Sequence, residues 1–256
     1  MANNTTRRRR SSLSRVDAKE AVDLATAQTY SENVFLFAPN LIGYTRVILA
    51  ALSLHFMSYH PIYCTIAYSI SCLLDAVDGP VARARGETSK FGAVLDMVTD
   101  RCTTSCLLCY LGIAYPQYAI LFQFLITLDF SSHYMHMNSS LVTGSASHKK
   151  VTSDVSRILY AYYNNSTTLF LVCAGNELFF VALYLVKWTS TPVWIPFLGH
   201  ALGGLTYAQA VALMTAPVCV LKNIINVVQL WKAAKVLVGV DLAERANARR
   251  EKLARQ

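Results

Sequence analysis

The sequence predicts an all-α integral membrane protein with six transmembrane helices, and three observations support this prediction. Of the 256 residues, 54% are hydrophobic and 15% are charged, well below the roughly 25% charged residues of soluble domains. Apolar runs that approach the roughly 20 residues needed to cross the hydrocarbon recur along the chain. Basic residues gather between alternate runs. The predicted spans are 34–57, 61–78, 91–114, 118–136, 166–187 and 205–230.

The distribution of basic residues predicts the orientation of these spans. With the N-terminus in the cytoplasm, nineteen of the 23 Lys and Arg residues fall in cytoplasmic segments, and the opposite loops hold only Lys187. This asymmetry follows the positive-inside rule and predicts that both termini are cytoplasmic. A nucleic-acid partner is not expected, because its binding would need these charges on one folded surface beside aromatic platforms.

Four segments are predicted along the chain. Residues 1–15 are rich in Arg and poor in apolar residues, which predicts a disordered basic tail that either contacts anionic membrane lipid or has no role. Residues 16–33 mix apolar and charged residues and predict an amphipathic helix on the membrane surface. Residues 34–230 form the six-helix domain, with no cleavable signal peptide before it. Residues 231–256 alternate apolar and basic residues at helical spacing, which predicts a cytoplasmic helical tail.

Four acidic residues at the cytoplasmic ends of the second and third spans are the main functional candidates. Charges are costly in a bilayer, so Asp75, Asp78, Asp96 and Asp100 need compensation. Their spacings of three and four place each pair on one side of its helix. A connecting loop of about a dozen residues predicts that the two helices are antiparallel neighbours whose carboxylates converge. Such an oxygen-rich cluster suits Mg²⁺ or Mn²⁺, with charge for two ions.

The segment between the acidic pairs carries features that suit a phosphate ligand. Gly79 and Gly92 remove side chains where a ligand or backbone must approach closely, and Arg83 supplies a fork that matches phosphate oxygens. In the alternative interpretation, nearby arginines neutralise the acids for structural reasons only. The complete pattern is Asp75-x2-Asp78-Gly79-x2-Ala82-Arg83-x8-Gly92-x3-Asp96-x3-Asp100.

This pattern resembles the signature of the CDP-alcohol phosphatidyltransferase family, with every signature position filled. Segments 32–46, 95–102, 132–140, 144–149 and 173–179 look like the eukaryotic phosphatidylinositol synthase branch of the family. This narrower resemblance implies transfer of a phosphatidyl group from CDP-diacylglycerol to myo-inositol, which yields phosphatidylinositol and CMP. It also implies a homodimer in the endoplasmic reticulum membrane, with the active site facing the cytoplasm.

The resemblance also implies roles for individual residues. Asp75, Asp78 and Asp96 would bind the ions, and Asp100 would both complete the second ion's shell and act as the base. A carboxylate suits this task, because an inositol hydroxyl is a weak nucleophile until its proton is accepted. The positions that match contacts to the cytidine-diphosphate part of the donor are Asn40, Gly79, Arg83 and Ser89.

Other polar residues leave alternatives open. Arg46 and Arg101 either bind donor phosphate or acceptor, or form ion pairs with neighbouring aspartates. His133, one turn after Asp129, has part of a metal-ligand spacing but no converging partner, which favours polar packing or inositol contact. His148 belongs to a polar loop that either closes over inositol or is simply solvated.

Asn176 and Glu177 are polar residues within the fifth predicted span. Polar side chains inside a span commonly form hydrogen bonds between helices. We therefore predict that these two residues form an interhelical hydrogen-bond pair.

Two alternative functions differ from inositol transfer. One is a relative in the same family that uses glycerol phosphate, serine or choline as its acceptor. The other is a membrane transporter whose acidic residues form an ion pathway. A transporter is expected to place its charged site near the midplane between repeats. Here the acids gather at one face and no internal repeat is evident, which favours the enzyme.

Overall fold

The computed structural model describes residues 18–26, 32–143, 162, 165–190 and 205–255. Every regular element within these residues is a helix, which confirms the all-α prediction. The predicted basic tail, residues 1–15, and the candidate acceptor residue His148 both lie outside the described residues.

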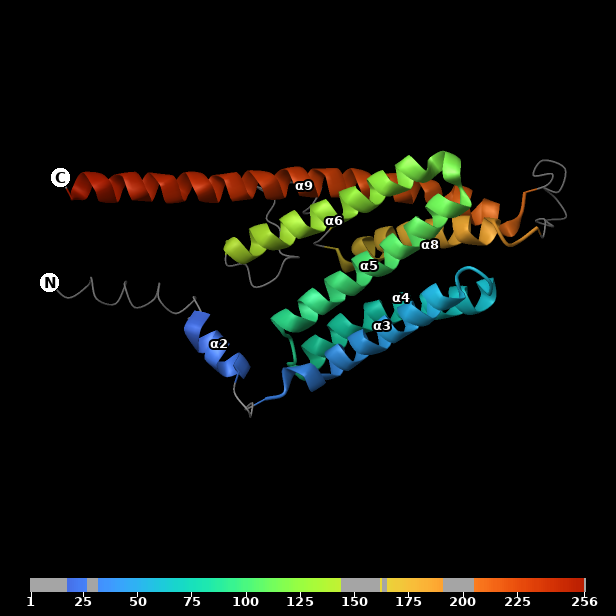
Figure 1. Ribbon diagram of the computed structural model, residues 1–256, viewed down its shortest axis with the longest axis horizontal. Helices are drawn as coiled ribbons and strands as arrows, with labels where there is room; N and C mark the ends of the chain where they lie inside the picture. The colour runs from blue at the N-terminus through green and yellow to red at the C-terminus, as the bar shows by residue number, and fades with distance from the viewer. Residues whose placement is uncertain (1–17, 27–31, 144–161, 163–164, 191–204, 256) are drawn as a thin grey trace.

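Within the described residues, six long helices form a bundle, and one predicted apolar run corresponds to each of them (Figure 1). A short helix and two 3-10 turns accompany them. The elements are α2 (Ala18–Thr26), η1 (Val34–Leu36), α3 (Ala38–Phe56), α4 (Pro61–Arg85), α5 (Lys90–Ala114), η2 (Pro116–Tyr118), α6 (Ala119–Val142), α8 (Ser166–Val186) and α9 (Tyr207–Ala254).

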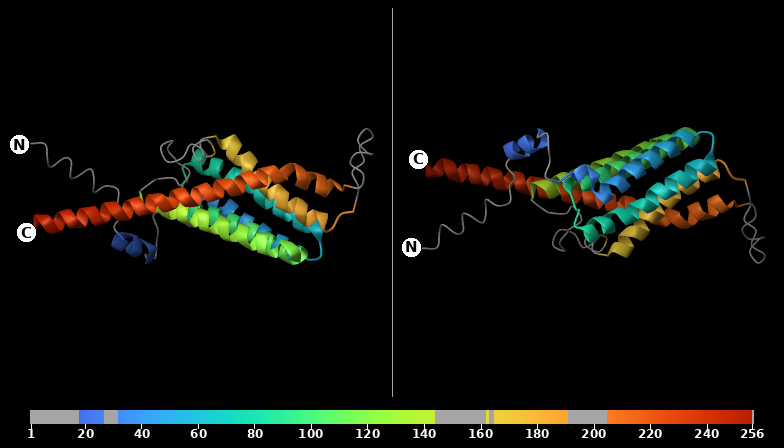
Figure 2. Two further views of the ribbon diagram at one scale, coloured as in Figure 1. Left: turned by 90° about the horizontal axis from the view of Figure 1, so that it is seen from above. Right: turned by 90° about the horizontal axis from the view of Figure 1, so that it is seen from below.

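Two helices organise the bundle. The first, α3, packs against both α4 and α5, while α4 and α5 have little close backbone contact with each other. The second, α9, packs against both α6 and α8, and α5 joins the two halves through its contacts with α6 and α8. Figures 1 and 2 show that the C-terminal part of α9 projects beyond the other long helices, at the end of the bundle where α2 lies.

The apolar core lies toward the end of the bundle that holds the α3–α4 and α5–α6 connections (Figure 1). Leu107, Leu108 and Leu111 of α5 are almost completely buried there beside Tyr184 of α8. The Tyr184 hydroxyl also donates a 2.8 Å hydrogen bond to the carbonyl oxygen of Met57. This packing fixes one end of the bundle.

The outer surface of the bundle is apolar to an extent typical of a membrane protein. Ile62, Ile113, Ile120 and Met214 are each at least 69% exposed, and large apolar patches of this kind mark membrane or protein contacts. Among the described residues, three helices are long and apolar enough to cross a membrane, namely α4, α8 and α9. These observations support the prediction of a membrane protein.

The helix that contains the second predicted span continues beyond the apolar run, and the connection after it is shorter than predicted. We predicted a span over 61–78 and a connection of about a dozen residues, but α4 continues to Arg85 and the connection is only Gly86–Ser89. Pro80 lies inside the helix without ending it. The prediction failed because hydropathy marks the edge of the apolar run, whereas a helix ends where its backbone geometry changes.

Specific interactions define this turn between α4 and α5. Gly86 has a left-handed backbone with φ of 68°, and the amide of Glu87 donates to the carbonyl of Ala82 at 2.9 Å, which is a common glycine-based end for a helix. The Ser89 hydroxyl then accepts a hydrogen bond from the Gly92 amide at 2.9 Å and so caps α5. The second acidic pair therefore starts from a fixed helix end.

Candidate active site

The four predicted aspartates converge, and the group at their centre is an arginine from α3. The Arg46 side chain is 2% exposed and forms ion pairs with all four carboxylates. Its guanidinium lies 2.8 Å from Asp75, 2.9 Å from Asp78 and 2.8 Å from Asp96, and it also contacts Asp100. Of the two roles considered for Arg46, the structure shows the ion pair with neighbouring aspartates.

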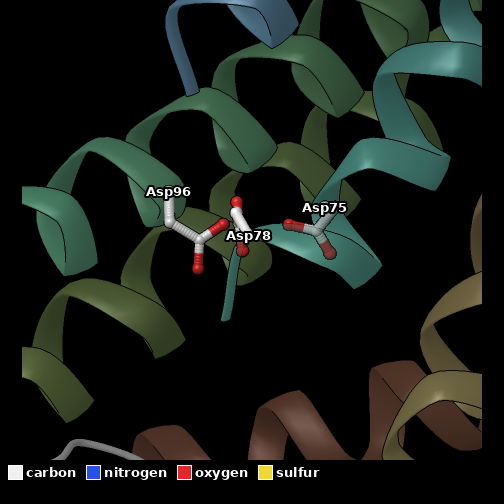
Figure 3. Close-up of side chains that lie close together, drawn as sticks. All are labelled: Asp75, Asp78 and Asp96. Atoms are coloured by element: carbon white, nitrogen blue, oxygen red, sulfur yellow. The ribbon is translucent and has the colours of Figure 1, made fainter. Parts of the chain in front are cut away.

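Three of these carboxylates have the geometry of a cation site. Asp75, Asp78 and Asp96 each offer one carboxylate oxygen, and these oxygens lie within 4.8 Å of one another. Figure 3 shows the side chains of Asp75 and Asp78 on α4 and of Asp96 on α5 turned toward one another. Such a donor set fits Mg²⁺ or Mn²⁺, which prefer oxygen ligands. Asp100 lies beside this trio, with its Oδ2 atom 3.4 Å from Arg101 Nη2.

Helix α3 helps to bring the two acidic pairs together, because its backbone packs against both α4 and α5, whereas the backbones of α4 and α5 have few close contacts with each other. The Ser71 hydroxyl of α4 donates to the carbonyl oxygen of Arg46 at 3.1 Å. On the other side, a Cβ atom at Gly43 would come 2.8 Å from the Leu95 side chain of α5. Glycine at this position thus permits the close approach of α3 to α5 that places Arg46 between the carboxylates.

The candidate donor contacts Asn40 and Ser89 lie close to Gly92. Asn40 is 1% exposed, and its Nδ2 group donates to the carbonyl of Val34 at 2.5 Å. Its Oδ1 atom has no hydrogen-bond partner among the described residues. A Cβ atom at Gly92 would lie 2.6 Å from this oxygen and 3.0 Å from Ser89 Oγ. The missing side chain at Gly92 therefore makes room for both polar groups.

The other two candidate donor contacts lie on α4 and not in a loop. A Cβ atom at Gly79 would be 3.3 Å from Arg83 Nη1, so the Arg83 side chain passes over the glycine one turn before it. Both residues belong to the part of α4 that continues past Asp78. The helix therefore fixes the backbone of Arg83 relative to the acidic cluster, and the Arg83 side chain is exposed.

A second ionic network begins next to Asp100. Arg101 Nη1 donates to both carboxylate oxygens of Asp129 on α6, at 2.7 and 2.8 Å. Asn226 of α9 donates to the same carboxylate at 3.1 Å and accepts from Lys222 Nζ at 2.6 Å. The network thus links Asp100 of α5 to α6 and α9. Arg101 forms an ion pair with neighbouring aspartates, which is one of the two roles predicted for it.

Lys222 and Asn226 are functional residues of this network that the sequence did not predict. Their spacing of four residues inside an apolar span was the available signal, because a basic residue in the membrane needs a polar partner. Nothing local in the sequence indicated that this partner would connect to Asp129.

His133 packs inside the second network. Its Nδ1 atom lies 2.9 Å from the Asp129 carbonyl oxygen and 3.5 Å from the Asp129 carboxylate, and its Nε2 atom lies 3.4 Å from Arg101 Nη1. In the part of the chain that the structure describes, the aspartate trio is the group that meets the geometry of a metal site. This arrangement favours polar packing of His133 over metal binding.

Fold and site together define a helical membrane protein with a cluster of aspartates, suited to a divalent cation, at one end of its bundle. The model of the CDP-alcohol phosphatidyltransferase family matches residues 36–239, and this chain belongs to that family.

Individual relatives cover most of the chain. A CDP-diacylglycerol–inositol 3-phosphatidyltransferase of Schizosaccharomyces pombe is 52% identical over 85% of this chain and 95% of its own length. The proteins of the same name from Saccharomyces cerevisiae and Rattus norvegicus are 45% and 43% identical, over 85% and 84% of this chain and 92% and 98% of their own lengths. No solved structure matches the chain.

Proposed function

We propose that this protein transfers the phosphatidyl group of CDP-diacylglycerol to myo-inositol and releases CMP. The observation that carries the proposal is the convergence of Asp75, Asp78, Asp96 and Asp100 at one point, since these are the aspartates of the family signature. The names of relatives that are 43–52% identical support inositol as the acceptor.

Two divalent ions, Mg²⁺ or Mn²⁺, are the proposed cofactors, held by Asp75, Asp78 and Asp96 with Asp100 completing the second site. The four carboxylates outnumber the single guanidinium of Arg46 that contacts all of them, so the site retains an excess of negative charge that divalent ions would balance. When bound, such ions draw charge from the pyrophosphate and stabilise the departing CMP.

Asp100 is the proposed general base. Its carboxylate lies outside the trio of close oxygens, which leaves it positioned to accept the proton of an inositol hydroxyl during attack on phosphorus. Arg101 lies against Asp100 and is itself fixed by both oxygens of Asp129. Arg101 would therefore hold the base carboxylate in one orientation.

The donor nucleotide is proposed to bind between the start of α3, the C-terminal part of α4 and the α4–α5 connection. Asn40, Gly79, Arg83 and Ser89 lie on these elements. The buried, unpartnered Oδ1 atom of Asn40 supports a polar ligand at this position, and the Arg83 fork suits a phosphate group. His133 and His148 are kept as candidate acceptor contacts.

The proposed topology has six spans with both termini in the cytoplasm, in the endoplasmic reticulum membrane. Six long helices and the alternation of basic segments support it. Val22 and Leu24 of α2 are both 61% exposed, which suits a helix that rests on lipid. We further propose a homodimer, in keeping with the family resemblance.

A transfer assay tests the function directly. Purified protein in detergent receives labelled myo-inositol, CDP-diacylglycerol and Mg²⁺ or Mn²⁺, and both lipid-soluble label and CMP release are followed. We expect the two products to appear in equal amounts and to disappear with EDTA. Incorporation of serine or glycerol phosphate without incorporation of inositol would overturn the proposed acceptor while leaving the reaction class intact.

A further inference from the structure

Glu177 is a carboxylate of α8 that lies among the transmembrane helices and has no part in the proposed chemistry. Its Oε2 atom accepts a 2.7 Å hydrogen bond from the Tyr68 hydroxyl of α4, and its Oε1 atom accepts one of 3.0 Å from the Thr104 hydroxyl of α5. Asn176 of the same helix donates to Oε1 at 3.4 Å. The predicted bond between Asn176 and Glu177 is present within α8, whereas the interhelical bonds join Glu177 to α4 and α5.

The two hydroxyl partners stand on the same helix faces as the acidic cluster. Tyr68 precedes Asp75 by seven residues, and Thr104 follows Asp100 by four, and residues at these spacings share one side of a helix. Both partners are buried, with exposures of 2% and 7%. The Glu177 carboxylate therefore joins α4 to α5 one to two turns deeper in the bundle than the aspartates.

This bridge occurs where the backbone offers little other support. The backbones of α4 and α5 have few close contacts with each other, although each helix carries half of the cluster. Arg46 of α3 links them at the level of the carboxylates, and Glu177 links them from α8 below that level. Two cross-links at different depths fix both the separation of the helices and the angle between them.

We propose that Glu177 is a positioning residue for the metal site, because its hydrogen bonds to Tyr68 and Thr104 set the distance between the acidic pairs of α4 and α5. The inference rests on the proposed function only in that the aspartates bind divalent ions. It does not depend on which alcohol is the acceptor.

Three substitutions of Glu177 distinguish a role in bridging the two helices from a role of its negative charge. Glu177→Met removes both hydrogen bonds, Glu177→Asp keeps the charge but shortens the side chain, and Glu177→Gln keeps the length with one acceptor and one donor for the two hydroxyls. Bridging predicts that the Asp and Met variants are impaired and the Gln variant is close to normal. If only the negative charge matters, the Asp variant should be close to normal and the Gln variant should be impaired.

The readout is the Mn²⁺ dissociation constant, measured by electron paramagnetic resonance on the purified full chain without substrates. We expect Glu177→Met to weaken Mn²⁺ binding about tenfold, the low end of what residues supporting metal ligands contribute. Thr104→Val should also weaken Mn²⁺ binding. Combining it with Glu177→Met should cause no additional loss of affinity. Thr103→Val is the matched control, since Thr103 is buried beside Thr104 and its hydroxyl donates to the Thr99 carbonyl of its own helix, with no bond to another helix among the described residues.

The thermal midpoint in EDTA identifies variants that are unfolded. If Glu177→Met does not fold, Thr104→Val and Glu177→Asp are used for the test instead. Unchanged Mn²⁺ affinity in folded Glu177 variants, or an equal loss in Thr103→Val, would overturn the proposal. Failure of inositol transfer by the wild-type protein would overturn the proposed function instead, and the Mn²⁺ measurements would still stand.

Discussion

Arg46 forms ion pairs with all four aspartates of the site through one side chain. Its two terminal nitrogens serve four carboxylates, with Nη1 facing Asp78 and Asp96 and Nη2 facing Asp75 and Asp100. Removing one member of a buried ionic group leaves the others uncompensated, which costs more than the intact group contributes. The carboxylates therefore depend on Arg46 whenever divalent ions are absent.

Substitution of Arg46 tests this dependence. We expect Arg46→Met to destabilise the protein in EDTA by roughly 3–5 kcal/mol, measured as a lower thermal midpoint, and we expect Mg²⁺ or Mn²⁺ to restore part of the loss. Arg85→Met is the matched control, because Arg85 is 62% exposed and pairs with Glu87 at the surface, where such pairs contribute about 0–1 kcal/mol. Equal effects of the two substitutions would contradict the central role of Arg46.

Asp100 is tested by removing its ability to accept a proton. Asp100→Asn preserves shape and is expected to lower kcat by roughly 10²–10⁴, the usual contribution of a general base. The fold and donor binding should remain largely intact. Initial rates at saturating CDP-diacylglycerol and inositol measure the effect, with the thermal midpoint as a check on folding. Near-normal turnover would exclude Asp100 as the base.

At the scale of elements, the start of α5 is the most tightly fitted part of the site. Glycine at position 92 leaves the space that Asn40 Oδ1 and Ser89 Oγ occupy, and an added Cβ atom would come 2.6 and 3.0 Å from these oxygens. Such overlap forces side chains or backbone to shift. The helix cap and the candidate nucleotide contacts thus share one tight packing arrangement.

Gly92→Ala should therefore destabilise the protein by about 1–3 kcal/mol and raise the KM for CDP-diacylglycerol, measured from the thermal midpoint and from initial rates. Gly239→Ala in α9 is the control, since within the described residues nothing outside the surrounding turns of α9 itself lies within 4 Å of its added Cβ. Alanine there should be neutral or stabilising by up to about 1 kcal/mol. A tolerated Gly92→Ala would show that Asn40 does not occupy this space in solution.

At the scale of the whole molecule, α9 performs two different tasks along one continuous helix. Its 48 residues extend over roughly 70 Å at about 1.5 Å per residue, more than twice the roughly 30 Å of a bilayer's hydrocarbon. The part near Asn226 and Gln229 is buried against α6, whereas residues 241–255 are all exposed. Only the first part contributes to the bundle.

Truncation should reveal this division. Removal of residues 241–256 is expected to change the thermal midpoint by no more than about 2 °C, because no buried contact is lost, and to leave the inositol transfer rate nearly unchanged. Truncation before Asn226 removes the α9 partner of Asp129 and should prevent accumulation of folded protein. A large loss from the shorter truncation would assign an additional role to the exposed end of α9.

Topology is tested by protease protection in sealed membranes. An epitope tag at the C-terminus should be digested from the cytoplasmic side, while a tag inserted after Lys187 should be protected, because the basic segments favour a cytoplasmic C-terminus. Detergent should make both tags accessible. Protection of the C-terminal tag would contradict the six-span arrangement.

The helical class, the six apolar runs and the spacing of the acidic pairs could all be predicted from the amino-acid sequence, because these properties follow from the order of residues within one helix. The sequence also indicated the family through its signature, which the family match over residues 36–239 confirmed. The end of α4 was misplaced, since Gly86 and its hydrogen bonds fix that end independently of hydropathy.

Only the tertiary structure decided which side chains meet across helices. Arg46 lies 29 residues before Asp75 in the sequence, and no local pattern distinguishes the centre of a cluster from an ordinary ion pair. Glu177 likewise acquires its partners from α4 and α5. Periodicity gives the face of each helix, but the partner of that face depends on how distant segments pack, and this packing turns four aspartates into one site.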